Sequence, residues 1–139
     1  MRNNQPVNAN EFMVRADASI ISRTDRRGVI TYVNDDFIEA SGYAADELLG
    51  QPHNLLRHPD IPAEAFRDMW ATIESGKPWV GVVKNRRRDG GYYWVRATVT
   101  PVGDEGFMSV RVRASREEIA AAEALYAAMR RDPGLRLLA

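Results

Sequence analysis

Three strand-like segments joined by two glycine turns occupy residues 79–114, and they restrict the fold more than any other part of the sequence. Residues 79–87 alternate in character, which places Trp79, Gly81, Val83 and Asn85 on one face of a strand. Asp89-Gly-Gly91 forms a turn, residues 92–102 return, and residues 107–114 follow a second turn. Short turns of this kind join antiparallel neighbours. The second half of the chain is therefore predicted to be an antiparallel meander.

The first half of the chain predicts a β-hairpin and then a series of helices. Residues 18–24 and 29–33 carry β-branched residues on either side of the turn Asp25-Arg-Arg-Gly28. Asn34 follows the second strand directly and is a strong N-cap, because its side-chain oxygen can accept a backbone N–H of the first helical turn. Short helices are expected at 35–41, 44–49 and 52–56, with a helical turn at 11–17.

Two longer helices are predicted after these. The first opens at Asp60-Ile-Pro62, since proline suits the first helical turn, and ends at Gly76. Its buried stripe is predicted to consist of Phe66, Met69, Trp70 and Ile73. The last helix covers residues 115–130, where Ser115 and Glu118 form a capping box. Its apolar stripe is Ile119, Ala122, Leu125, Tyr126 and Met129.

This order of elements predicts an α+β fold: a five-stranded antiparallel sheet with helices packed on one face, plus a C-terminal exit helix. Residues 1–10 show no periodicity and are expected to be a flexible arm, disordered or docked on a partner. We expect no second domain and no internal repeat. Residues 135–139 carry no structural stop signal, so the chain is expected to be a fragment of a longer protein.

The composition excludes several classes of function. The chain has 139 residues, of which 45% are hydrophobic and 27% charged, as is typical of a globular domain. A formal net charge of +0 argues against binding nucleic acid by bulk charge. Without cysteine there can be no disulfide, thiolate catalysis or cysteine metal site. No apolar run approaches the ~20 residues of a membrane span, so we expect no membrane insertion and a cytoplasmic location.

The segment His53–Asp60 holds both histidines of the chain and is the main candidate for a polar site. Arg57 precedes a predicted helix, and arginine at a helix N-terminus favours an anion such as a phosphate. The alternative is that Arg57 pairs with Asp60 while His58 only packs. We expect Asp60 to cap the helix and to orient Arg57. Two histidines five positions apart, with no carboxylate at metal spacing, make a poor zinc site.

Asn85 and Trp79 share the inward face of their predicted strand. A buried amide is costly unless both of its ends find partners, and either a ligand or the neighbouring backbone would satisfy Asn85. Trp79 offers a flat surface to a ring system, although aromatic residues on a buried strand face are more often core. Trp70 and Trp94 are expected to be core. A basic run is expected to be a solvated edge: Lys84, Arg86, Arg87 and Arg88.

Three groups of residues resemble a known family. Tyr32-Val-Asn-Asp-Asp-Phe37, Gly42-Tyr43 and Glu47-Leu-Leu-Gly50 are similar to motifs general to PAS domains. Two further groups resemble the N-terminal flavin-binding PAS domain of bacterial aerotaxis receptors. They are Pro52–Asp60 with Met69-Trp70, and Gly76-Lys-Pro-Trp79 through Lys84-Asn-Arg86 to Tyr93-Trp-Val-Arg96 and Thr100-Pro101. The resemblance implies a PAS sensor domain over residues 11–114 and a linker or signalling helix over 115–139.

The same resemblance implies FAD bound without a covalent link, with FMN as the alternative. It assigns the cofactor-linked positions to Asn34, Arg57, His58, Asp60, Trp79 and Asn85. The light-oxygen-voltage (LOV) branch of PAS domains gives a second comparison. Its reactive cysteine falls near His53, a flavin-contacting asparagine near Asn85, and a flavin-contacting glutamine near Arg111. Since His53 replaces the cysteine, no cysteinyl photo-adduct can form in this chain.

The function implied is redox sensing without catalysis, in which the state of the flavin is relayed to a signalling partner of a chemotaxis pathway for aerotaxis. When the flavin is reduced, Asn85 would rotate its amide, and Arg57 or Arg111 would compensate the negative charge added to the flavin. The alternative is an interaction module that binds another small molecule or none. It would form a homodimer through its PAS surface or through helix 115–130. A flavoenzyme is disfavoured, because no activated nucleophile or acid–base pair is evident.

Overall fold

The structure is a computed structural model that describes residues 6–131. It begins with β1 (Ile20–Asp25) and β2 (Ile30–Val33), an antiparallel hairpin whose turn ends at Gly28. The second half of the chain forms β3 (Trp79–Arg86), β4 (Tyr92–Val102) and β5 (Gly106–Arg113), an antiparallel meander. The predicted hairpin and the predicted meander are both confirmed.

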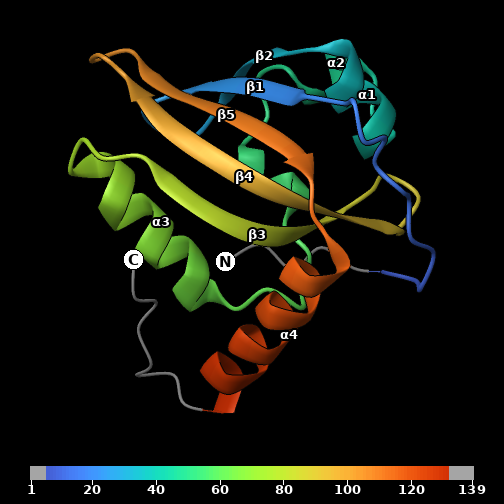
Figure 1. The fold of residues 1–139 in the computed structure, drawn as a ribbon. Helices are drawn as coiled ribbons and strands as arrows, with labels where there is room; N and C mark the ends of the chain where they lie inside the picture. Colours follow the sequence, from blue (N-terminus) through green and yellow to red (C-terminus); the bar gives the residue numbers. More distant parts are fainter. Residues whose placement is uncertain (1–5, 132–139) are drawn as a thin grey trace.

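The five strands form one antiparallel sheet in the order β2-β1-β5-β4-β3 (Figure 1). The last strand therefore lies in the centre, beside the first. Ser22 of β1 is opposite Ser109 of β5, and Ile20 is opposite Arg111. This pairing places the polar residues of two distant segments on one face of the sheet, because residues two apart on a strand share a face.

The helices between β2 and β3 are α1 (Asp35–Ser41), α2 (Ala45–Leu48), the 3₁₀ helix η1 (His53–Leu56) and α3 (Ala63–Glu74), and α4 (Arg116–Arg131) follows β5. Asn34 caps α1, since its Oδ1 accepts the N–H of Phe37 at 3.0 Å. At α4 the Ser115 hydroxyl accepts the N–H of Glu118, and the Glu118 carboxylate accepts the N–H of Ser115. Both predicted caps are confirmed.

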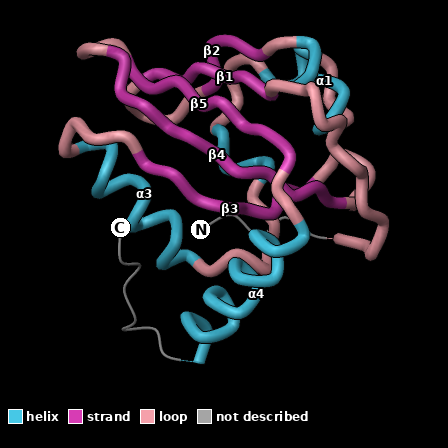
Figure 2. The backbone as a smooth tube through the Cα atoms, viewed as in Figure 1, coloured by secondary structure: helices cyan, strands magenta, loops and turns pink. Residues whose placement is uncertain are grey.

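The sheet separates two apolar clusters. The larger lies on the inner face, where Phe37, Leu56 and Ile73 from the helices meet Ile20 and Val95 from the strands. The smaller joins Tyr126 and Met129 of α4 to Trp94 and the partly buried Val82, which point to the other face by strand alternation. The Tyr126 hydroxyl donates to the Val82 carbonyl at 2.6 Å. The exit helix is thus a packed part of the fold, and it lies beside β3 together with α3 (Figures 1 and 2).

Two predictions on the N-terminal side of the domain need correction. Residues 11–17 do not form a helical turn, because Glu11 bridges to Tyr92 along β4 instead. Asp60 does not cap α3, whose N-cap is Pro62 without a side-chain hydrogen bond. Within the expected arm, the Asn8 N–H donates to the Gly90 carbonyl at 2.9 Å, so residues 6–10 lie along the β3–β4 turn. Residues 1–5 and 132–139 lie outside the described residues.

The basic run at the β3–β4 turn is only in part a solvated edge: Arg88 is exposed, but Lys84, Arg86 and Arg87 are partly buried. Arg87 donates to the carbonyls of Ala40 (2.7 Å) and Glu39 (3.3 Å) at the C-terminal end of α1. Its guanidinium also lies 4.4 Å from the centroid of the Phe12 ring. Because α1 has no basic residue in its own last turn, Arg87 supplies the cation that the negative end of a helix favours.

Candidate functional site

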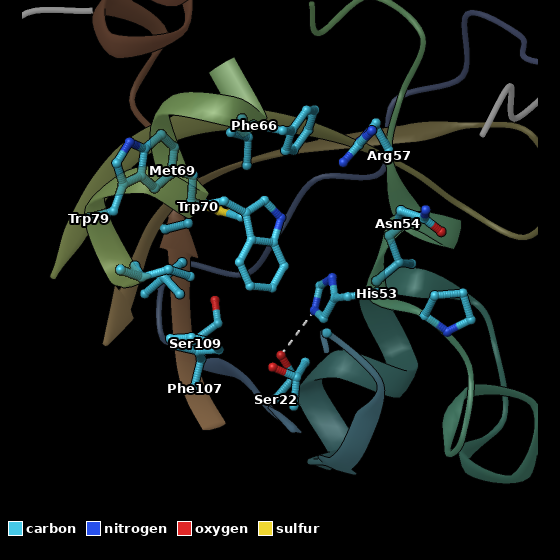
Figure 3. Close-up of a pocket in the computed structure, with 18 of the residues that line it drawn as sticks. Ser22, His53, Asn54, Arg57, Phe66, Met69, Trp70, Trp79, Phe107 and Ser109 are labelled. Carbon is cyan, nitrogen blue, oxygen red and sulfur yellow. Dashed lines mark hydrogen bonds between the residues drawn. The ribbon is translucent and has the colours of Figure 1, made fainter. Parts of the chain in front are cut away.

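A cavity of about 310 Å³ lies between the inner face of the sheet and the segment that runs from η1 to α3 (Figure 3). Small-molecule sites in proteins begin at about this volume. Its strand side is lined from β1, β3, β4 and β5, and the β1–β2 turn contributes Arg27 and Gly28. Its helix side includes all four residues of the predicted α3 stripe: Phe66, Met69, Trp70 and Ile73. The stripe therefore borders a cavity as well as the core, in which Ile73 is buried.

Arg111, Ser22 and His53 form a closed hydrogen-bonded group at the floor of this cavity. Arg111 Nη1 lies 3.2 Å from Ser22 Oγ, and Nη2 lies 3.1 Å from His53 Nε2. Ser22 Oγ is also 3.1 Å from His53 Nε2, as the dashed line in Figure 3 marks. A guanidinium can only donate, so Nε2 must be the acceptor, and the ring proton of His53 lies on Nδ1.

The electrostatics of this group are those of a buried cation. Burial and the neighbouring Arg111 charge lower the pKa of His53 to about 3, so the imidazole is neutral at pH 7. Burial lowers the pKa of Arg111 to about 10, which leaves the guanidinium charged. Arg111 is 6% exposed. In residues 6–131 no carboxylate forms an ion pair with it. Burying a charge without a counter-charge costs folding free energy, so the presence of Arg111 at this position calls for an explanation.

Two further polar groups at the cavity are left without partners. Among the described residues, Asn85 Nδ2 and Ser109 Oγ have no hydrogen-bond partner at normal geometry, although Asn85 is only 7% exposed and Ser109 only 6%. Burial raises the pKa of the Tyr93 phenol, but the Asn85 side chain lies close enough to that hydroxyl to offset part of the rise, so Tyr93 is a polar neighbour of Asn85 within the protein. Most buried polar atoms in native structures are paired, so such exceptions require an explanation. The neighbouring backbone does not bind the Asn85 amide nitrogen, which argues against the alternative that backbone groups alone satisfy this side chain.

Arg57 and Trp79 also line the cavity, from opposite sides. The Arg57 guanidinium stacks 3.9 Å from the centroid of the Phe66 ring, and burial lowers its pKa. Trp79 Nε1 donates to the Asp68 carboxylate of α3 at 3.1 Å. The Trp79 indole lies flat against Gly81, where an added Cβ would sit 2.2 Å from the ring. Glycine at 81 therefore allows the indole to cover β3.

Five of the eight residues predicted to bind a cofactor line this cavity: His53, Arg57, Trp79, Asn85 and Arg111. Asn34, His58 and Asp60 do not. Asn34 Oδ1 accepts the N–H groups of Ile21 and Phe37, and Nδ2 donates to the Ser19 carbonyl, so the side chain joins β1 to α1.

His58 lies at the outer end of the same segment and is 2% exposed. Its Nδ1 accepts the Asp60 N–H at 3.0 Å, and its ring meets the edge of Tyr92. Burial, with the Lys84 charge, lowers the pKa of His58 to about 4. The Asp60 carboxylate binds Lys84 at 2.8 Å.

Trp70, Ser22 and Ser109 are among the cavity residues that were not predicted as site residues from the sequence. Trp70 projects into the cavity between Phe66 and His53 (Figure 3) and meets the edge of Phe107, with ring centroids 5.5 Å apart. Its position on the apolar stripe predicts burial but does not distinguish a core from a cavity wall. Ser22 and Ser109 carry hydroxyls at inward-facing positions of two strands, where the alternation predicts apolar side chains. A polar residue at such a position is the sequence signal that could have identified them.

Comparison with known proteins decides the family. The family described as the PAS fold matches residues 30–114, which is more than half of the chain. This chain belongs to the PAS family. The fold-class prediction and the family resemblance are both confirmed.

Several individual proteins are similar to this PAS domain. The aerotaxis receptor of Escherichia coli (strain K12) is 53% identical over 117 residues, which cover 81% of this chain and 23% of that receptor. A nitrogen fixation regulatory protein of Klebsiella pneumoniae is 41% identical over 90 residues, 65% of this chain and 18% of that protein. This PAS domain thus spans less than a quarter of the length of either relative.

A solved structure reported as "Flavin Analogue Sheds Light on Light-Oxygen-Voltage Domain Mechanism" has the same fold. Its TM-score is 0.64 at 22% identity, over 82% of this chain and 87% of that one. In residues 6–131 no helix is both long and apolar enough to cross a bilayer. Within the same residues, no three histidine, aspartate or glutamate side chains gather as metal ligands. The family and its relatives identify a sensor domain of the signalling type.

Proposed function

We propose that this PAS domain binds a flavin, FAD with FMN as the alternative, and reports its redox state to a signalling partner. The observation that carries the proposal is Arg111, a buried cation beside the cavity with no carboxylate partner in the described part of the chain. A ligand whose polar edge can take negative charge would compensate it. The similar aerotaxis receptor and the LOV structure whose title names a flavin analogue support this choice.

The residues at the cavity fit a flavin ring in two respects. Apolar and aromatic side chains such as Trp70 and Met69 provide flat walls, which suits a planar heterocycle. Arg111 and the amide nitrogen of Asn85 are hydrogen-bond donors, and the Ser109 hydroxyl can also donate. A donor-rich floor matches the carbonyl and nitrogen acceptors of the pyrimidine edge. Arg57 carries positive charge at the η1 side, which suits the phosphate-bearing tail.

A bound flavin supplies electron and proton uptake, and the protein side chains respond to the resulting change in charge and hydrogen bonding. Arg111 would stabilise added negative charge. Asn85 would exchange its amide nitrogen for its oxygen by rotation, because one end donates and the other accepts. Neutral His53 offers Nε2 as an acceptor to Arg111 and Ser22, so any shift of Arg111 breaks or remakes that closed group. These are local switches of the kind that move a partner surface.

The role of the domain in the cell is part of the same proposal. By analogy with the aerotaxis receptor, the partner would be a downstream signalling module of a chemotaxis pathway, and the domain would act in the cytoplasm without catalysing a reaction. Asn34 and His58 would support the cofactor indirectly, since their polar atoms bind the protein itself. A homodimer through α4 or the PAS surface is the alternative output.

The direct test is the absorption spectrum of the purified chain. We expect a yellow protein with the visible bands of oxidised flavin, and mass spectrometry of the denatured protein should release FAD or FMN. Protein that is folded by circular dichroism, remains colourless and takes up no added FAD or FMN would contradict the proposal. Release of a different small molecule would support the interaction-module alternative.

A further inference from the structure

The pocket wall at Arg57 is connected to α4 through a short segment that touches both. Residues 57–60 run along the free edge of β3, where Arg57 forms a backbone bridge to Asn85. The Asp60 carboxylate then binds Lys84 Nζ at 2.8 Å on the outer face of β3. Arg130 of α4 donates to the backbone carbonyl of the same Asp60. Asp60 is therefore the point where the pocket segment, β3 and α4 meet.

Lys84 makes this junction more than a surface ion pair. Its side chain is only 13% exposed, and its ammonium lies 4.3 Å from the centroid of the Tyr92 ring. The hydrogen bond from Lys84 is the main cause that lowers the pKa of Asp60. A lysine held over an aromatic ring has lost most of its rotamer freedom already, so its bond to Asp60 is expected to fix the segment.

A second contact crosses the same boundary. Phe66 of α3 lines the cavity and also packs against the cluster formed by α4. The Arg57 guanidinium stacks on that ring at 3.9 Å. The position of Arg57 therefore depends on Asp60 through the backbone and on Phe66 through its side chain. Helix α4 binds Asp60 directly and shares an apolar cluster with Phe66.

The geometry points to Asp60 as a positioning residue that couples α4 to the pocket. It does not line the cavity, and it sets Arg57 by fastening residues 57–60 to Lys84 and to Arg130. Loosening the contacts of Asp60 with Arg130 and Lys84 is then expected to lower ligand affinity, and a bound ligand is expected to strengthen those contacts in return by the same coupling factor. This inference rests on the proposed function for its ligand, but the coupling itself belongs to the protein alone.

The test compares Arg130→Gln with Arg131→Gln in the full chain. Both arginines are exposed on the last described turn of α4, but only Arg130 binds Asp60. Asp60→Asn removes the Lys84 ion pair in a third variant. Arg96→Gln is the control for α4 docking at a distance from Asp60, since Arg96 pairs with Glu118 at the start of the helix. The measurements are the dissociation constant for FAD by fluorescence titration, and hydrogen exchange of residues 54–61 and 116–131.

Arg130→Gln and Asp60→Asn should each weaken FAD binding about 5-fold, a coupling of the usual size. Both should speed amide exchange in residues 54–61 of the ligand-free protein. Arg131→Gln and Arg96→Gln should change neither quantity. Faster exchange confined to α4, with residues 54–61 and the dissociation constant unchanged, would overturn the inference. If the wild-type chain binds no flavin, the proposed function fails, and exchange in residues 54–61 of the ligand-free variants still decides the coupling.

Discussion

The two faces of the sheet use similar residues for different purposes. On the outer face, polar groups near α4 are paired: Tyr126 with the Val82 carbonyl, Lys84 with Asp60, and Arg96 with Glu118. On the inner face, Arg111 has no carboxylate, and Asn85 and Ser109 each keep an atom without a partner in the described chain. The difference separates a face whose polar groups are paired within the protein from one that, under the proposed function, a bound ligand would complete.

The helices that cover these faces show the same contrast. The stripe of α4 fills a core, in which Tyr126 is 4% and Met129 1% exposed. The stripe of α3 has the same period, but its Met69 and Trp70 are only partly buried and border the cavity. Amphipathic periodicity therefore predicts which side of a helix turns inward, and it does not predict whether that side is filled.

The largest expected effect is the loss of stability in acid, because each face holds one buried histidine. The folded pKa values of His53 (about 3) and His58 (about 4) lie below the value of 6.5 expected when unfolded. The unfolded chain therefore binds these protons first, so stability is full above pH 6.5 and falls as the pH drops towards 4. Each histidine should contribute up to about 1.4 kcal/mol per pH unit, measured by urea unfolding.

The variants His53→Gln and His58→Gln show how much each histidine contributes to the pH dependence of the free energy of unfolding. Each should remove about half of the pH dependence of the free energy of unfolding. Added FAD should leave the His58 part unchanged, because His58 does not line the cavity. A slope that is unchanged in both variants would show that carboxylates dominate acid unfolding.

A matched pair of methionines tests whether the two stripes differ. Met129→Ala, at a site 1% exposed, should lower the free energy of unfolding by about 3 kcal/mol through lost contacts and a new cavity. Met69→Ala should lower it by about 1 kcal/mol, because part of that side chain already borders empty space. Equal losses in thermal or urea unfolding would mean that α3 is packed as tightly as α4.

A matched pair of arginine variants tests whether the buried cation on the inner face lacks a partner within the protein. Arg111→Met should raise the free energy of unfolding of the ligand-free protein by about 1 kcal/mol, since a buried cation without a counter-charge is removed. The same variant should bind FAD at least about 10-fold more weakly, as expected for a lost charged hydrogen bond. Arg96→Met on the outer face should change stability by less than about 0.5 kcal/mol and leave binding unchanged. Destabilisation by Arg111→Met would place its partner within the protein.

The last test concerns a hydroxyl on the outer face of the sheet. Tyr126→Phe removes the bond to the Val82 carbonyl and should lower the free energy of unfolding by about 1 kcal/mol. Its phenol is largely buried, which raises the pKa of Tyr126 to about 12, so the loss should be constant from pH 6 to pH 9. Loss of FAD binding in this variant would show that the α4 face reaches the pocket by a route other than Asp60.

The fold was largely predictable because its signals are local. Asn34 and Ser115 mark the first turns of their helices, because their side chains accept backbone N–H groups there. The turns that end at Gly28 and Gly91 join strands that are adjacent in sequence. The polar group at Arg111 was not predictable in the same way. Its contact with Ser22 spans 89 positions and depends on β5 pairing with β1, which no local pattern encodes. The Asp60 carboxylate likewise binds Lys84, 24 positions away, rather than capping its own helix.

The contact of Arg87 with α1 has a consequence for the order of folding. Helix α1 has only seven residues, and the guanidinium that binds its last carbonyls comes from 47 positions later in the chain. Helices this short are marginal in water by themselves. The C-terminal end of α1 is therefore expected to become stable only after the β3–β4 turn has emerged during synthesis. Substitutions in α1 should then mainly speed unfolding, while those in the β3–β4 hairpin should slow refolding.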